Sequence, residues 1–189
     1  MGQLEGKVAI ITGAGTGIGK GIAGVFAREG ATLVIASRKQ ENLERTAAAL
    51  RPGGATVAVV PTDVTVEAQV AGLFESTVRD LGRLDILVNN SGVFDGGPLE
   101  EIALETWRNV LEVNLTGVFL CTREAMKIMK RQKGGRIINI GSVSAQVPRF
   151  NHAPYTAAKH GLVGLTKSTA LEGREHGISA GCLHPGNTM

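Results

Sequence analysis

The sequence predicts a doubly wound α/β domain, in which helices cover both faces of a parallel sheet. Short apolar runs alternate with longer amphipathic runs from end to end, and a glycine-rich turn follows the first apolar run. Most of the short runs are almost wholly apolar rather than alternating, which is typical of strands covered on both faces. A chain of 189 residues fits a single domain, spanning residues 1–189.

The elements follow from these runs in order. Six short runs are predicted as strands, namely Val8–Thr12, Thr32–Ala36, Thr56–Val60, Ile86–Val88, Arg136–Ile140 and Ile178–Leu183. Five longer runs place apolar residues at helical spacing and are predicted as helices. They are Gly17–Glu29, Glu41–Leu50, Val66–Leu81, Thr106–Arg131 and Pro154–His176.

Composition excludes several classes of protein. Hydrophobic residues make up 43% and charged residues 20% of the chain, which argues against disorder. The net charge is only +3, with one Trp and one Tyr to stack on bases, so we expect no nucleic-acid partner. Because no apolar stretch is long enough to span a bilayer, we expect no membrane association and a cytoplasmic protein.

The turn after the first predicted strand has the chemistry of a phosphate site. It reads Thr12-Gly13-Ala14-Gly15-Thr16-Gly17-Ile18-Gly19, between a strand and a helix. Glycine permits positive φ and close backbone approach, and a helix N-terminus offers N–H groups to an anion. We therefore predict cofactor contacts from Gly13, Thr16, Gly17, Ile18 and Gly19; a tight turn without ligand is the alternative.

A second glycine pattern lies just downstream. Gly19-Lys20-Gly21-Ile22-Ala23-Gly24 matches the dinucleotide fingerprint G-x-G-x-x-G, but it falls inside the predicted helix, where a pyrophosphate cannot reach the amides. We interpret these glycines as allowing close packing of helix on sheet.

The end of the second strand indicates which cofactor is bound. A site specific for NAD places an acidic residue there, whereas this chain has Ala36-Ser37-Arg38-Lys39. Arg38 could pair with a 2′-phosphate, so NADP(H) is favoured over NAD(H), and Ser37 and Arg38 are predicted as cofactor contacts. The alternative is that Arg38 and Lys39 are merely solvated.

Polar residues also collect where later strands end, at the edge where open α/β sheets bind ligands. The only tyrosine, Tyr155, precedes Lys159 by four residues, so both lie on one helical face. A nearby ammonium lowers the pKa of a phenol, which makes the pair a plausible general acid and base. Ser142 follows the fifth strand and could hydrogen-bond a substrate oxygen. The four histidines show no metal-motif pairing, so we expect no metal site.

The chain resembles the short-chain dehydrogenase/reductase family over its whole length. The resemblance rests on the glycine turn, Asn89-Asn90-Ser91-Gly92, Asn114, Ser142, Tyr155-Thr156-Ala157-Ala158-Lys159 and Pro185-Gly186. Ser91 stands where the family usually has alanine. A Rossmann-like fold is implied. Members normally continue past Pro-Gly, so the chain ending at Met189 is expected to lack the C-terminal strand and the substrate lid.

The resemblance also implies individual roles. Tyr155 would exchange the proton of the substrate oxygen, Lys159 would assist it and hold the nicotinamide ribose, and Ser142 would orient that oxygen. Asn114 would support a water-linked proton relay. Further cofactor contacts would come from Tyr155 and from Asp63, Val64, Asn90, Pro185, Gly186 and Thr188. The helices containing Asn114 and Gly161 would pack against another subunit of a homodimer or homotetramer; close packing within one chain is the competing explanation.

The predicted function is thus an NAD(P)-dependent oxidoreductase that interconverts a small-molecule carbonyl and alcohol by hydride transfer. The alternative is a nucleotide-binding but catalytically impaired, truncated family member, and a nucleotide-dependent interaction module is a third hypothesis. The loops Val93–Pro98 and Ala145–Ala153 are expected to line part of the substrate pocket.

Overall fold

The computed structural model of the chain describes residues 2–186. Within these residues the strands form one six-stranded parallel sheet, in the order β3-β2-β1-β4-β5-β6. The strands are β1 (Val8–Thr12), β2 (Thr32–Ser37), β3 (Val57–Pro61), β4 (Ile86–Asn89), β5 (Gly135–Ile140) and β6 (Ile178–Leu183). The predicted fold class and strands are confirmed, with ends that move by a residue at most.

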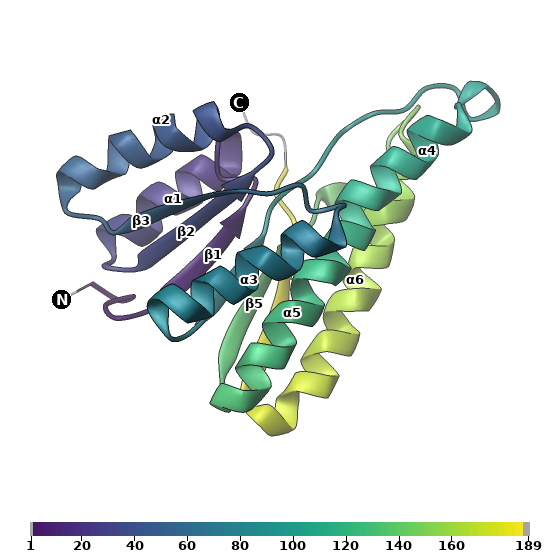
Figure 1. The fold of residues 1–189 in the computed structure, drawn as a ribbon. Coiled ribbons are helices and arrows are strands. Elements are labelled where there is room, and N and C mark those ends of the chain that lie inside the picture. Colours follow the sequence, from purple (N-terminus) through teal and green to yellow (C-terminus); the bar gives the residue numbers. More distant parts are fainter. Residues whose placement is uncertain (1, 187–189) are drawn as a thin grey trace.

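Helices cover both faces of the sheet (Figure 1). They are α1 (Gly17–Arg28), α2 (Gln40–Leu50), α3 (Glu67–Leu81), α4 (Leu104–Leu111), α5 (Gly117–Gln132) and α6 (Ala153–Gly173). Helices α1 and α2 lie on one face, and α3, α5 and α6 lie on the other (Figure 1). Within residues 2–186, no helix combines the length and the hydrophobicity that a membrane crossing requires.

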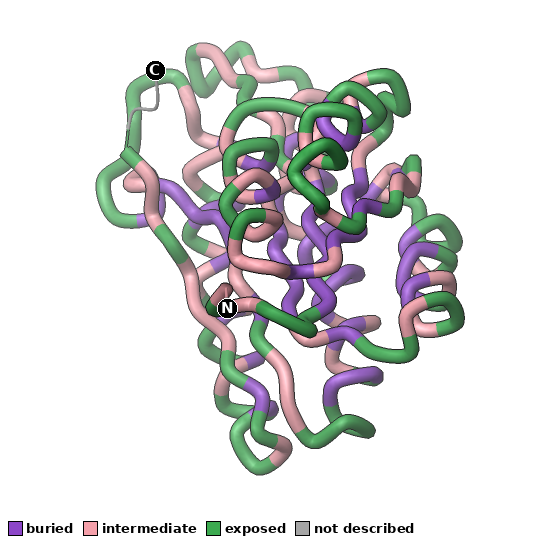
Figure 2. The backbone as a smooth tube through the Cα atoms, turned by 90° about the vertical axis from the view of Figure 1, so that its left-hand side faces the viewer, coloured by how far each residue is buried: buried purple, intermediate pink, exposed green. Residues whose placement is uncertain are grey.

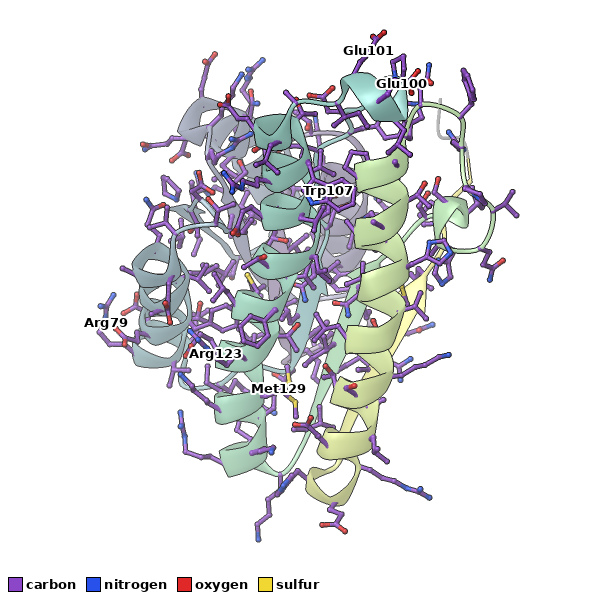
Figure 3. All side chains as sticks on the ribbon, turned by 90° about the vertical axis from the view of Figure 1, so that its right-hand side faces the viewer. Arg79, Glu100, Glu101, Trp107, Arg123 and Met129 are labelled. Atoms are coloured by element: carbon purple, nitrogen blue, oxygen red, sulfur yellow. The ribbon has the colours of Figure 1, made fainter. Side chains whose placement is uncertain are left out.

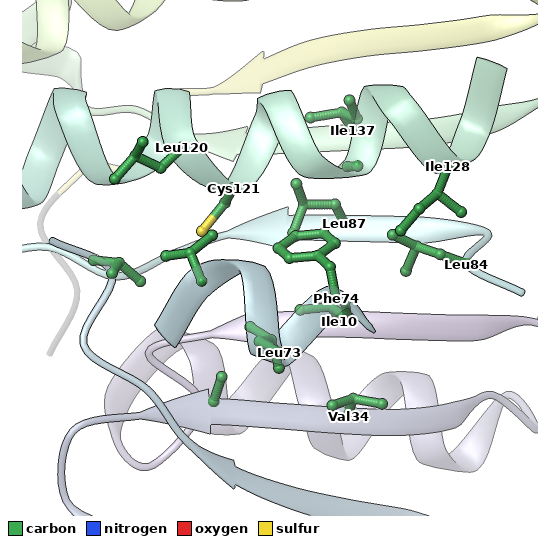
Figure 4. Close-up of a cluster of buried hydrophobic side chains, with 14 of the residues drawn as sticks. Ile10, Val34, Leu73, Phe74, Leu84, Leu87, Leu120, Cys121, Ile128 and Ile137 are labelled. Atoms are coloured by element: carbon green, nitrogen blue, oxygen red, sulfur yellow. The ribbon is translucent and has the colours of Figure 1, made fainter. Parts of the chain in front are cut away.

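Alternation along the central strands supplies a core to each face. Ile10 of β1 and Leu87 of β4 pack with Phe74 of α3 against α5 (Figure 4). Ile11, one residue further along β1, belongs to the cluster under α1 and α2. Successive strand side chains point to opposite faces, so a fully apolar strand serves both layers. Every residue of β1 and β4 is buried, and Figure 2 shows buried backbone running through the middle of the molecule.

One predicted helix is interrupted. The run Thr106–Arg131 begins earlier, at Leu104, and contains a π-helical turn at Glu112–Thr116 between α4 and α5. Single π turns inside α-helices often occur at functional sites. This one carries the buried Asn114.

The sheet order reverses between β1 and β4, which creates a crevice at the carboxyl ends of these strands. Open α/β sheets bind ligands at such a switch point. The glycine turn follows β1, and Asn90 follows β4. The fold therefore brings these two segments together at one edge.

Candidate active site

The glycine turn connects β1 to α1 in a conformation that needs glycine. Gly13 and Gly17 have φ values of +66° and +53°, which L side chains rarely adopt. A Cβ on Gly19 would overlap the side-chain amide of Asn90 and the carbonyl oxygen of Gly13. Thr16, at the start of α1, makes no side-chain capping bond. The first-turn amides of α1 are therefore placed to receive an anion.

Asn90 clamps this turn to the end of β4. Its Nδ2 donates to the carbonyl oxygens of Thr12 (3.1 Å) and Gly13 (3.2 Å). Thr12 Oγ1 in turn accepts from the backbone N–H groups of Asn90 (3.0 Å) and Ser91 (3.1 Å). The shape of the turn thus depends on Asn90 as well as on the glycines.

The interpretation of the downstream glycines is wrong for two of them. They lie inside α1 as predicted. However, a Cβ added to Gly21 would have open space around it, with no neighbouring heavy atom within 4 Å. Gly24 has only ordinary contacts, with Arg28 and with Leu50 of α2. Both face away from the sheet, so only Gly19 is required by close approach.

A cavity of about 560 Å³ extends from the glycine turn to the ends of β2 and β3. Gly15 borders it, and a Cβ there would lie 2.9 Å from Asn42 Cβ and 3.3 Å from Ser37 Oγ. The predicted residues that line it are Gly13, Thr16, Gly17, Ile18, Ser37, Arg38, Asp63, Val64 and Asn90. Lys39 and Asn42 also line it and were not predicted as site residues, although Lys39 directly follows Arg38 and Asn42 lies in the first turn of α2.

A second cavity, of about 240 Å³, adjoins the first and shares Ile18, Asn90, Gly92 and Val93 with it. It is lined by the predicted Asn114, Ser142, Tyr155, Lys159, Pro185 and Gly186, together with the unpredicted Phe94, Ile140 and Gly141. The structure thus gathers residues from β5, α6, the π turn and the segments after β5 and β6 at one place. Gly19 is buried beneath the glycine turn, and Thr188 lies outside the described residues.

Lys159 lies beneath Tyr155, one helical turn further along α6. Its Nζ is 5.5 Å from the centroid of the Tyr155 ring and donates to the carbonyl oxygen of Ile140 at 2.7 Å. Only 5% of Lys159 is exposed. Burial lowers the pKa of the Lys159 ammonium to about 8, because it disfavours the charged form.

Ser142 follows β5 with its hydroxyl held by a local turn. Its Oγ accepts a hydrogen bond from the backbone N–H of Ser144 at 3.1 Å. A hydroxyl has one proton to donate in addition to its lone pairs. The Ser142 proton is therefore left for a group in the cavity.

Asn114 is fully buried in the π turn. Its Nδ2 donates to the carbonyl oxygens of Val93 and Val110, both at 2.9 Å. These two bonds fix the amide orientation, and Oδ1 has no partner among the described residues. An unpaired buried acceptor costs free energy, so a donor is expected to occupy the cavity beside it.

Two aromatic residues lie at the border of the smaller cavity, Phe94 in its lining and His152 packed against Phe94, and only their loops were predicted. Phe94, 55% exposed, packs edge-on against Tyr155 at 4.9 Å between centroids and tilts against His152 at 4.1 Å. The first predicted pocket loop thus reaches the cavity of about 240 Å³ through Val93 and Phe94. Residues 148–153 of the second loop instead line a separate apolar cavity of about 1070 Å³, because the Phe94 and His152 rings lie between the two.

Comparison with known proteins gives a consistent result. A family model described as short chain dehydrogenase matches residues 7–189. "Uncharacterized oxidoreductase YxjF" of Bacillus subtilis is 45% identical over 183 residues, which are 97% of this chain and 71% of that protein.

Solved structures agree with this result. Actinorhodin polyketide ketoreductase with NADPH superposes with a TM-score of 0.94 at 38% identity, covering 98% of this chain and 72% of that one. NAD⁺-bound xylitol dehydrogenase superposes with a TM-score of 0.95 at 32% identity, covering 97% and 71%.

Proposed function

The chain belongs to the short-chain dehydrogenase/reductase family, and on this premise we propose that it interconverts a carbonyl and an alcohol with Tyr155 as general acid and base. Membership of this family makes the chain an NAD(P)-dependent oxidoreductase. One observation carries the finer proposal: a single cavity, adjoining the glycine turn, is lined by Asn114, Ser142, Tyr155 and Lys159.

The two adjoining cavities fit a dinucleotide. Packing requires glycine at two positions that line them: a Cβ on Gly13 would lie 2.8 Å from Asn90 Nδ2, and a Cβ on Gly92 would lie 2.8 Å from Asn114 Oδ1. Gly17, with positive φ, opens α1. The bound cofactor would supply or accept a hydride at the catalytic end.

We assign NADP(H) as the preferred cofactor because of the residues after β2. Arg38 and Lys39 are exposed, and both line the cavity of about 560 Å³ beside the glycine turn. Neither forms an ion pair with another residue in the range 2–186. An unpaired guanidinium matches a 2′-phosphate in charge and geometry, whereas no carboxylate stands at the end of β2 to receive a ribose hydroxyl.

Tyr155 and Ser142 would act on the same substrate oxygen. The Ser142 proton, left over from the turn to Ser144, would be donated to that oxygen and would stabilise its negative charge. The Tyr155 hydroxyl would give its proton to the oxygen during reduction and take it back during oxidation. Phe94, packed edge-on against Tyr155, limits the positions that the phenol ring can take.

Lys159 and Asn114 would support this proton transfer. The Lys159 ammonium, held under the phenol ring, would stabilise the negative charge that develops on Tyr155 as it gives up its proton. The unpaired Oδ1 of Asn114 would hold a water molecule in the same cavity, through which a proton could pass to or from Lys159.

The proposal is tested by titrating the chain with NADPH and NADH, using nicotinamide fluorescence, and by assaying a panel of aliphatic, alicyclic and aromatic ketones. Tight NADPH binding with turnover of at least one ketone is the expected result. Binding without turnover of any ketone would favour the catalytically impaired alternative.

We also propose that the chain forms a homo-oligomer through the outer face of α5 and α6, the two helices side by side in Figure 1. Trp107, on α4, lies against the upper part of α6 (Figure 3). Exposed small and apolar residues line this face, including Gly164, Phe119 and Leu171, the last 74% exposed. Close packing within one chain explains Gly161 instead, because a Cβ added there would lie 3.0 Å from Leu115 Cδ2 of the same chain.

Light scattering tests the oligomer proposal. Gly164 has open space around its Cβ position within one chain, so Gly164→Arg should leave the fold intact while separating the subunits. A wild-type chain that is monomeric at assay concentration would contradict the proposal.

A further inference from the structure

The segments that follow β5 and β6 run side by side and are joined by three hydrogen bonds. Gly141 N donates to Leu183 O at 2.6 Å, and Val143 N donates to Pro185 O at 3.2 Å. Between them, His184 Nδ1 lies 2.9 Å from the carbonyl oxygen of Ser142. The first two bonds come from the backbone, and the third depends on one side chain.

The imidazole supplies a donor that the backbone lacks at this place. A carbonyl oxygen only accepts, so Nδ1 of His184 carries the proton in this contact. Pro185, the next residue, has no N–H to donate and joins the ladder between the two segments only through its carbonyl oxygen. The side chain of His184 therefore adds a third cross-link between the two backbone bonds.

Gly141 makes the space for this contact. A Cβ on Gly141 would lie 2.7 Å from His184 Nδ1 and 2.8 Å from Cys182 Sγ, closer than such atoms normally approach. The histidine on one segment and the glycine on the other are thus matched. A side chain at position 141 would force the imidazole away from Ser142.

The contact joins the two walls of the catalytic cavity. Ser142 lies on one wall, and Pro185 and Gly186 form part of the other. We infer that His184 is a positioning residue, which fixes the site of the substrate oxygen at Ser142 relative to the wall that would face the nicotinamide. This inference rests on the proposed function, because it gives these walls their roles.

Two amide variants separate the hydrogen bond from the bulk of the side chain. His184→Asn can place an amide N–H near the position of Nδ1, whereas His184→Gln places it near Nε2. We measure the Kd of each variant for NADPH and for 2′-phospho-ADP-ribose, which lacks only the nicotinamide. His184→Gln should bind NADPH about 3- to 10-fold more weakly, as expected for one lost hydrogen bond, while His184→Asn stays close to wild type. Both should bind 2′-phospho-ADP-ribose like wild type.

Several results would overturn the inference. Equal NADPH affinity in all three proteins, or equal weakening in both variants, would show that the Nδ1 bond positions nothing. Parallel loss of 2′-phospho-ADP-ribose binding would indicate general damage to the fold instead. A wild-type chain that binds neither NADPH nor NADH would refute the proposed function itself, which makes that failure distinguishable.

Gly141→Ala provides a second approach to the same bond. It should weaken NADPH binding at least as much as His184→Gln does, because the new Cβ displaces the imidazole and also lies 2.9 Å from the carbonyl oxygen of Leu183. The double variant should bind NADPH no more weakly than Gly141→Ala alone, since both substitutions remove the same His184 contact. Additive losses would contradict the coupling.

Discussion

Two glycines in α1 should respond in opposite ways to the same substitution. In Gly19→Ala, the new methyl group would overlap the Asn90 amide and the Gly13 carbonyl oxygen, and it would lie 2.9 Å from the Gly13 carbonyl carbon. Overpacking of this kind costs about 1–3 kcal/mol. Displacing Asn90 also threatens its bonds to Thr12 and Gly13, worth about 1 kcal/mol each.

Alanine is favoured over glycine by about 1 kcal/mol inside a helix, which offsets part of this cost. The net loss in the free energy of unfolding for Gly19→Ala is therefore about 2–4 kcal/mol. Gly21→Ala is the matched control, because Gly21 is exposed and has no neighbour near its Cβ position. It should gain about 0.5–1 kcal/mol.

Urea denaturation measures both variants, and a fluorescence titration with NADPH shows whether the turn still binds. Gly19→Ala should lose NADPH affinity, because it displaces Gly13 and Asn90, which line the cavity of about 560 Å³. Gly21→Ala should retain NADPH affinity. Equal stability and equal NADPH affinity in the two variants would refute the reasoning about the turn.

Three further predictions concern the catalytic and cofactor ends. Tyr155→Phe should lower kcat for ketone reduction by about 100- to 10,000-fold with little change in the Kd for NADPH; unchanged turnover would rule out the proposed acid. Arg38→Asp should lower the kcat/KM ratio of NADPH to NADH by about 10- to 100-fold, and a constant ratio would disprove the role of Arg38. Burial lowers the pKa of Lys159 from 10.5 to about 8. Between pH 8 and pH 10.5, the Lys159 side chain is therefore mostly protonated in the unfolded chain and mostly neutral in the folded chain. Stability relative to Lys159→Met should therefore rise with pH from 8 to 10.5, by up to about 3 kcal/mol in urea denaturation. A flat difference would contradict the burial of a charged lysine.

Local sequence predicted those parts of the site that depend on local chemistry. The glycine turn could be located because a strand, three required glycines and a helix are consecutive in the chain. Tyr155 and Lys159 could be paired because helical spacing alone puts them on one face. Their roles remain proposals, to be tested as above.

Long-range packing decided what the sequence could not predict. The side-chain amide of Asn114, in the π turn, is oriented by a bond to Val93, which lies 21 residues away in a loop. Phe94 reaches Tyr155, and His184 reaches Ser142, only after β4, β5 and β6 are aligned. The packing role given to Gly21 and Gly24 was wrong because glycine content does not show which face of α1 meets the sheet.

Transfer of a labelled hydride tests the central claim most directly. The chain is incubated with a reactive ketone from the panel and NADPH deuterated at the transferable position of the nicotinamide ring, and the alcohol is analysed by mass spectrometry. Wild-type protein should give singly deuterated alcohol, and Tyr155→Phe, with its NADPH binding retained, should give almost none. Failure to form labelled alcohol from any ketone, or equal labelling by both proteins, would contradict the assignment of Tyr155 and its cavity as an oxidoreductase site.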